Sequence, residues 1–189
     1  MKFKILVAVL MIGAAAKADL LTFSLQEVGS DLVATVSGSV NTDALTANPG
    51  SYIWYPYLDP DTGWLLITPE SYMKGWYLTF DSTSFGGASS GFADSVSGDH
   101  VGVTLNSGEI WLPTDYVSGS DLYGTATWNN TSFDARHITP GTYTATYNDG
   151  ADSVVLQIGA VPEPATSGLL VLSGLALFGL RRLKNHYRS

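Results

Sequence analysis

Residues 21–26 read Leu21-Thr22-Phe23-Ser24-Leu25-Gln26 and alternate strictly between apolar and polar side chains. A period of two residues is typical of a β-strand with one buried face. Eight further segments of similar character follow, at residues 32–40, 64–67, 76–80, 101–105, 109–112, 122–128, 142–147 and 153–158. No helical period of useful length occurs between the two ends of the chain. The pattern predicts an all-β body.

The segments between these strands have the composition of tight turns. Examples are Asp61-Thr62-Gly63, Asn106-Ser107-Gly108, Pro140-Gly141 and Asn148-Asp149-Gly150. Such residues favour the backbone conformations of hairpin turns. We therefore expect an antiparallel β-sandwich, jelly-roll-like, over residues 19–160. Residues 41–51 and 85–99 are poor in strand signals and are expected to be surface loops.

The composition of this body limits what it binds. The chain has no cysteine, so the fold rests on packing without disulfides or thiolate metal sites. Residues 19–160 hold sixteen acidic residues but only Lys74 and Arg136 as basic ones, a net charge of −14. Such a surface repels nucleic acid and anionic lipid, and attracts divalent cations. We expect no nucleic-acid partner, and solubility alone also explains the charge.

The first eighteen residues have the organisation of a secretory signal peptide. Lys2 and Lys4 precede an apolar run over residues 5–16, and Ala16-Lys17-Ala18 fits the small-x-small cleavage pattern. The apolar run is too short for a typical membrane span. Residues 1–18 are thus predicted to be removed by signal peptidase, which makes Asp19 the first residue of the exported protein.

The last residues form a tail of three parts. Val161-Pro162-Glu163-Pro164-Ala165 comes first, an apolar run to Leu180 follows, and Arg181, Arg182 and Lys184 end it. The prolines block a helix, so we expect an apolar helix over residues 165–183. Its first sixteen residues would span about 24 Å as a helix, against a hydrocarbon core of about 30 Å. The basic cluster predicts a cytoplasmic C-terminus with the body outside.

This arrangement of a motif, an apolar run and a basic cluster resembles the PEP-CTERM sorting signal of bacterial exported proteins. The resemblance covers residues 161–189. It extends to parts of the body, notably residues 116–120, 126–133, 139–143 and 152–159, although Arg136-His137 departs from the pattern. The resemblance implies an inner-membrane-anchored precursor, processed by an exosortase and released to the cell surface or extracellular matrix. It implies a substrate of that enzyme, so no catalytic residue is expected. A plain tail anchor is the alternative.

Aromatic residues gather in a short stretch of the body. Tyr52, Trp54, Tyr55, Tyr57, Trp64, Tyr72, Trp76 and Tyr77 all lie within residues 52–77. Aromatic faces stack on sugar rings, and Trp and Tyr add a polar group at the edge of the contact. The alternative function is therefore an extracellular polysaccharide-binding module. Its candidate stacking residues are Trp54, Tyr55, Tyr57, Trp64 and Trp76, and the competing interpretation is that these rings pack the core.

Two further patterns suggest chemistry. Asp59-Pro60-Asp61-Thr62-Gly63 resembles the start of a calcium loop, but Glu70 is the nearest later acid, and a plain turn explains the residues equally well. Gly87-Ala88-Ser89-Ser90-Gly91 matches the nucleophile pattern G-x-S-x-G, with His100 or His137 as the base. That pattern needs a strand before it and a helix after it, and the flanks here are rich in Gly and Ser. We expect neither enzyme activity nor a cofactor.

Overall fold

One layer of the fold is a six-stranded sheet that contains both the first and the last strand of the body. The computed structural model describes residues 18–159. The order of strands in this sheet is β12-β13-β1-β2-β11-β8. Their bounds are β1 (Leu20–Val28), β2 (Asp31–Ser39), β8 (Ser95–Gly98), β11 (Asp121–Trp128), β12 (Gly141–Tyr147) and β13 (Asp152–Ile158).

The other layer is a seven-stranded sheet built from the middle of the chain, in the order β3-β6-β10-β9-β5-β4-β7. Its strands are β3 (Thr46–Trp54), β4 (Tyr57–Asp59), β5 (Trp64–Ile67), β6 (Ser71–Tyr77), β7 (Gly91–Phe92), β9 (Val101–Thr104) and β10 (Glu109–Pro113). Two short 3-10 turns, η1 (Thr42–Ala44) and η2 (Asn148–Gly150), complete the described elements. The prediction of an all-β body is confirmed.

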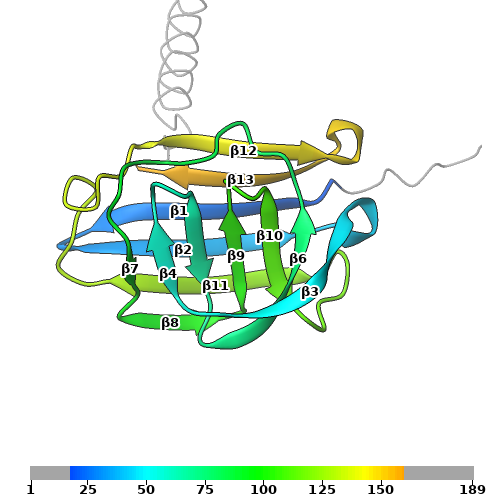
Figure 1. Ribbon diagram of the computed structural model, residues 1–189, viewed down its shortest axis with the longest axis horizontal. Helices are drawn as coiled ribbons and strands as arrows, with labels where there is room; N and C mark the ends of the chain where they lie inside the picture. Colours follow the sequence, from blue (N-terminus) through cyan, green and yellow to red (C-terminus); the bar gives the residue numbers. More distant parts are fainter. Residues whose placement is uncertain (1–17, 160–189) are drawn as a thin grey trace, which may run out of the picture.

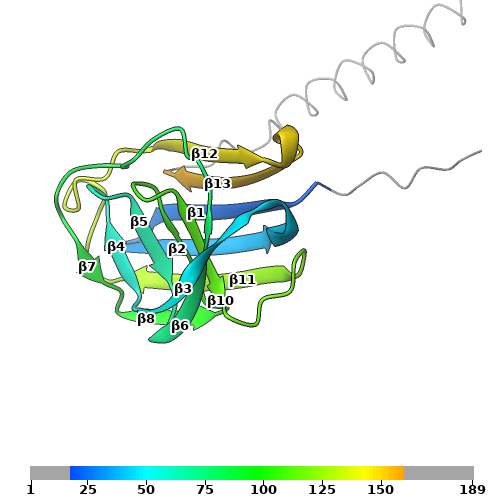
Figure 2. The same ribbon diagram turned by 45° about the vertical axis from the view of Figure 1, so that its right-hand side comes forward.

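The two sheets pack face to face as a β-sandwich. In Figure 1 the strands of the six-stranded sheet run across those of the seven-stranded sheet, and Figure 2 shows the two layers side by side. Alternate residues of β1 and β13 point into the space between them and are fully buried, as are Leu65 and Val103 from the other sheet. Trp128 closes one end of this core, and its Nε1 donates to the carbonyl oxygen of Gly91 at 3.1 Å.

The pairing of β1 with β13 departs from the expected antiparallel arrangement. These strands run parallel, with Leu20 opposite Ser153 and Leu25 opposite Ile158. The other strand pairs of the described residues are antiparallel. A parallel pair needs a long crossover between its strands, and here nearly the whole body provides it. Alternation along a strand carries no information about the direction of its neighbour.

Both predicted loops contain strands. Residues 41–51 form η1 and most of β3, an edge strand whose register shifts between Ala47 and Ser51. A proline is tolerated at such a bulge of an edge strand, which is where Pro49 lies. Residues 85–99 contain β7 and β8, and Phe85 is buried in the core. The strand predicted at 76–80 is also displaced, because β6 ends at Tyr77 and Phe80 contributes only an isolated bridge to Ala145.

Two glycines of the β1–β2 hairpin provide a test of this packing. A Cβ on Gly38 would lie 1.9 Å from the carbonyl oxygen of Leu20, whereas a Cβ on Gly29 would meet nothing within 4 Å. Both residues have positive φ, so alanine introduces backbone strain at both. We expect Gly38→Ala to lower the free energy of unfolding by about 1–3 kcal/mol more than Gly29→Ala, measured by urea denaturation. Equal losses at the two positions would contradict the close strand contact.

Candidate functional site

The seven-stranded sheet carries a second apolar cluster on the face turned away from the core. Leu66, Met73 and Trp111 are buried there, and Trp54, Tyr57 and Trp64 pack against them while partly exposed. Alternation explains the arrangement, because neighbouring residues such as Leu65, Ile110 and Leu112 point inward to the main core. Both faces of this sheet are therefore apolar, although only one of them is covered by the other sheet.

The aromatic side chains of this outer face form a continuous row. Trp54 lies between two other tryptophans of this row, with its ring centroid 4.9 Å from that of Trp111 and 5.2 Å from that of Trp64. Each neighbouring pair is tilted or edge-to-face, the geometry that the ring quadrupoles favour. We call this set the aromatic row, and its members in order are Tyr52, Trp111, Trp54, Trp64, Tyr57, Phe92 and Tyr55.

Two glycines in the strands of this sheet make room for large side chains on its outer face. A Cβ on Gly75 of β6 would lie 3.1 Å from the ring of Trp111, and one on Gly102 of β9 would lie 2.4 Å from Cδ2 of Leu66. A glycine inside a strand weakens it and is usually found where another group approaches closely. Here the approaching groups are the ring of Trp111 at Gly75 and the side chain of Leu66 at Gly102, so the two glycines let large side chains lie close to the outer face of the sheet.

The three tryptophans of the row differ in how their indole N–H groups are bonded. Nε1 of Trp64 donates to Oδ1 of Asn106 at 2.9 Å, and Nε1 of Trp111 donates to Oγ1 of Thr104 at 3.1 Å. Nε1 of Trp54 is buried and has no partner among the residues that the structure describes. A buried donor without an acceptor is costly, so Trp54 differs from the two tryptophans beside it in having an unsatisfied indole N–H.

Part of the row lines an open groove, which we call the aromatic groove. It has a volume of about 350 Å³, and its lining residues are Ile53, Trp54, Tyr55, Tyr57, Trp64, Leu66 and Phe92. Phe92 is 64% exposed and Tyr55 is 45% exposed, so the rim is open to solvent. The hydroxyl of Tyr55 donates to Oε1 of Glu70 at 3.2 Å. The nearby Glu70 carboxylate raises the pKa of Tyr55, which keeps this rim phenol neutral.

The structure brings four of the five candidate stacking residues together. Trp54, Tyr55, Tyr57 and Trp64 all line the aromatic groove. Trp76 lies elsewhere, because it packs in the main core and is only 7% exposed. Its position in the core is a correction to the predicted set, and its physical reason is alternation along β6: Met73 and Gly75 occupy the outer face, so Trp76 points inward.

Two members of the row were missed by the sequence interpretation. Trp111 and Phe92 belong to β10 and β7, far along the chain from the aromatic stretch at residues 52–77. Strand pairing brings them in, since β10 pairs with β6 and β7 pairs with β4. One indication was present for Trp111. It lies between the apolar residues Ile110 and Leu112, so if these two point into the core, the ring of Trp111 lies on the outer face. We find no comparable signal for Phe92.

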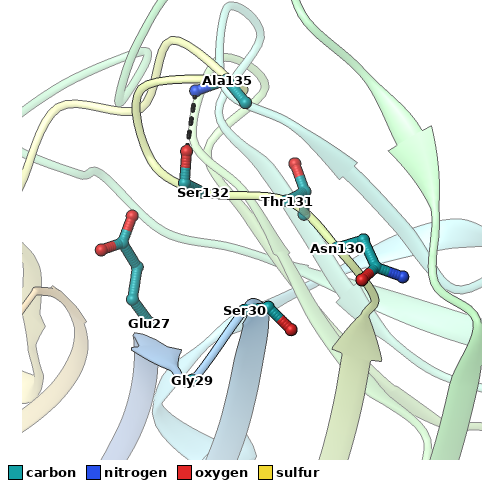
Figure 3. A pocket seen from close by; sticks show the side chains of 7 residues that line it. All are labelled: Glu27, Gly29, Ser30, Asn130, Thr131, Ser132 and Ala135. Atoms are coloured by element: carbon teal, nitrogen blue, oxygen red, sulfur yellow. Dashed lines mark hydrogen bonds between the residues drawn. The ribbon is translucent and has the colours of Figure 1, made fainter.

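A second hollow of about 370 Å³ lies where the β1–β2 turn meets the segment after β11. Figure 3 shows its lining, with Glu27, Gly29 and Ser30 on one side and Asn130 to Ala135 on the other. Hydrogen bonds already link the two sides: Glu27 accepts from the backbone N–H of Phe133 at 2.6 Å, and Thr131 donates its N–H to the carbonyl of Ser30 at 2.9 Å. These polar groups hold the loop in place, which accounts for the hollow structurally.

The other candidate patterns form ordinary elements of the fold. Asp59 ends β4 opposite Trp64, and the segment to Gly63 is the turn of the β4–β5 hairpin. Within residues 18–159, no group of three or more His, Asp or Glu side chains is placed to hold a metal ion. Residues 87–91 lead into strand β7 rather than a helix, so the strand-turn-helix geometry of a nucleophile elbow is not formed.

The predicted sorting motif, Val161 to Ala165, and the basic residues Arg181, Arg182 and Lys184 lie outside the described residues, as do residues 1–17 of the predicted signal peptide. Among residues 18–159, no helix has the length and apolar character needed to cross a membrane.

A comparison with protein-family models matches residues 160–184 to the PEP-CTERM protein-sorting motif. Comparisons with curated proteins and with solved structures give no match. The chain is thus a PEP-CTERM domain-containing protein, and the motif supports its sorting to the surface by an exosortase.

The unbonded indole of Trp54 gives a testable difference from its neighbour. We expect the free energy of unfolding of the Trp54→Phe variant to be about 1 kcal/mol higher than that of the Trp64→Phe variant. Both changes shrink one indole to a phenyl ring, but only the second breaks a hydrogen bond, that to Asn106. The free energies of unfolding of both variants, from urea denaturation, provide the comparison. An equal or larger loss for Trp54→Phe would show that its N–H is satisfied.

Proposed function

We propose that this protein is an exported, non-enzymatic surface protein that an exosortase processes at the tail. The PEP-CTERM motif supports an exported precursor anchored in the membrane. In this proposal the signal peptide directs export, the apolar segment 165–183 holds the body outside the inner membrane, and the basic cluster stops translocation. The residues Pro162, Glu163 and Pro164 present an extended stretch to the enzyme. The protein is the substrate, so it needs no catalytic residue.

The end of the folded body favours processing at the tail. Strand β13 lies inside the six-stranded sheet, between β12 and β1, and ends at Ile158. Gly159 still donates its N–H to the carbonyl of Leu25 at 3.0 Å. The matched motif begins at residue 160, directly after the last residue that the structure describes. An enzyme that acts on the motif therefore leaves every described strand of the body intact.

The intact mass of the protein tests the sorting proposal. We expect protein from the surface and culture fractions to lack the residues that follow the PEP motif, and to lack residues 1–18. In a strain without the exosortase, the same fractions should yield only protein with its complete C-terminus. An intact C-terminus in both strains would identify a plain tail anchor instead.

For the body, we propose that the aromatic groove binds an extracellular polysaccharide. The observation that carries this proposal is the aromatic row, which lies on the open face of a sheet and is partly exposed rather than enclosed in the core. Sugar rings stack on such aromatic faces, and the hydroxyl of Tyr55 at the rim provides a polar group for hydrogen bonds to sugar hydroxyls. A role in a surface matrix would follow from this binding.

The negative charge of the body limits the class of polysaccharide that the aromatic groove can bind. The body carries a net charge of −14 over residues 19–160, and Glu70 lies beside Tyr55 at the groove. An anionic polysaccharide would be repelled by this field, whereas a neutral one would not. We therefore propose a neutral polysaccharide as the ligand, held by ring stacking and by hydrogen bonds at the rim of the groove.

Binding measurements with separated ligand fractions test this proposal. We expect the body to bind the neutral fraction of exopolysaccharide from the producing strain, and not the anionic fraction. Replacing Trp64 or Tyr57 by Ala should weaken binding at least about tenfold, which corresponds to about 1.4 kcal/mol. Tyr123→Ala is the matched control, because Tyr123 is 60% exposed but lies on β11 of the other sheet.

Circular dichroism and urea unfolding establish that each variant is folded before its binding is compared. Unchanged affinity in the folded groove variants, or equal losses in Tyr123→Ala, would exclude the aromatic groove as the binding site.

A further inference from the structure

Asp152, the first residue of β13, is a buried carboxylate with neutral partners. It is 2% exposed. Its Oδ1 accepts from the backbone nitrogen of Asp19 at 2.8 Å, and its Oδ2 accepts from the side-chain amides of Asn41 at 3.1 Å and Asn148 at 2.7 Å. These three donors are all amides. A buried charge is expensive unless an opposite charge compensates it, and none of these partners carries one.

The nitrogen of Asp19 is held firmly at this position. The carbonyl oxygen of Asp19 accepts from the N–H of Ser153 at 3.0 Å, and its carboxylate accepts from the hydroxyl of Ser39. Strand β1 starts at the next residue, with Leu20 opposite Ser153. The preceding residue, Ala18, is exposed, so the Ala18–Asp19 peptide bond lies at the surface of the described body.

Asp19 is also the residue that follows the predicted signal peptidase site. Hydrolysis of the Ala18–Asp19 peptide bond adds water across the C–N bond. The carboxylate stays on Ala18, and the nitrogen of Asp19 becomes an α-amino group that takes up a proton at neutral pH. The neutral amide that donates to Oδ1 of Asp152 is thereby replaced by a cation on the same nitrogen atom.

We propose that Asp152, with Asn41 and Asn148, is a receptor for the α-ammonium group that signal peptidase creates at Asp19. This inference rests on the export step of the proposed function. The hydrogen bond at 2.8 Å then becomes a charge-assisted one, which is roughly twice as strong as a neutral bond. The ion pair joins the start of β1 to the start of β13, so removal of the leader stabilises the folded body. The precursor is the less stable form.

The ionisation of the groups around this pair sets its pH dependence. Burial opposes the charge on Asp152, but hydrogen bonds from Asp19, Asn148 and Asn41 outweigh it and lower the pKa of its carboxyl, which is ionised at neutral pH. Tyr147 and Tyr116 face the same region. Burial raises the pKa of Tyr147 to about 12 and also raises that of Tyr116. The carboxylates of Asp19 and Asp121 complete the charged neighbours of the two tyrosines.

The α-amino group is therefore the member of this network that titrates between pH 6 and 9.5. An ion pair raises its folded-state pKa above the unfolded value of about 7.7–8.0. The resulting stability is fully present below the unfolded pKa and is lost as the pH rises through the folded pKa. If the ion pair raises the pKa of the α-amino group by about one unit, the unfolding equilibrium constant at pH 6 is about tenfold smaller than it is without the pair.

The experiment compares the full-length exported protein with a variant that has one alanine inserted between Ala18 and Asp19. Both are purified in detergent after export, and mass spectrometry identifies their first residue. The variant keeps an amide at Asp19 and moves the ammonium one residue away. Urea unfolding, followed by tryptophan fluorescence, measures the unfolding equilibrium constant of each protein. This constant should be about tenfold smaller for the wild type than for the variant at pH 6, and nearly the same for both at pH 9.5. In the Asp152→Asn background the two N-termini should give equal stability at both pH values.

Each outcome separates the ion pair from the export proposal. A wild-type chain that starts at Asp19 but matches the insertion variant at pH 6 would overturn the ion pair and leave export intact. A first residue other than Asp19 would overturn the ion pair, since no ammonium then lies beside Asp152. A retained leader would also contradict the export step itself.

Discussion

The parallel pairing of β1 with β13 is the constraint on which the arrangement of this molecule depends. It brings the first and last strands of the body together inside one sheet, flanked by β2 and β12. Because the strands are parallel, they start at the same end of the sheet and finish at the other. Residue 19 therefore lies near the start of β13, and residue 159 follows its end, about 20 Å further along at the usual rise of a strand. The predicted leader and the sorting motif join the body at opposite ends, so one can be removed without disturbing the other.

The seven-stranded sheet shows how the same alternation serves two purposes. Its inward residues complete the core against the other sheet, and its outward residues form the aromatic row. A sheet face that needed only solubility would carry polar side chains. Here Gly75 and Gly102 sacrifice strand packing so that large side chains can lie against the sheet. The outer face therefore depends both on the residues that supply the rings and on the glycines that make room for Trp111 and Leu66, an arrangement that fits the ligand-binding surface we propose.

Sequence alone predicted the local features of this fold and missed those that depend on pairing. Alternation identified the strands around Phe23, Val103 and Leu156, because each has one face in the core. It missed β3, whose pattern is interrupted by the bulge around Pro49, and the burial of Phe85, which lies in a segment with few other apolar residues. It grouped Trp76 with Trp54 because proximity in sequence does not reveal which face a strand residue occupies. Trp111 joined the row only through the pairing of β10 with β6.

Because the body is acidic and has few basic side chains, an N-terminal amino group is an important source of positive charge in it. Along residues 19–160, the basic side chains are Lys74, which lies 5.5 Å from the ring centroid of Trp76, and Arg136, which donates to the carbonyl oxygen of Ser90. Neither is among the hydrogen-bond partners of Asp152. A body with so few basic side chains has one further source of positive charge in our proposal, the amino group that cleavage of the predicted leader releases at Asp19. Placing that group against a buried carboxylate compensates the charge where side chains do not, and makes the cut end of the chain a part of the folded structure.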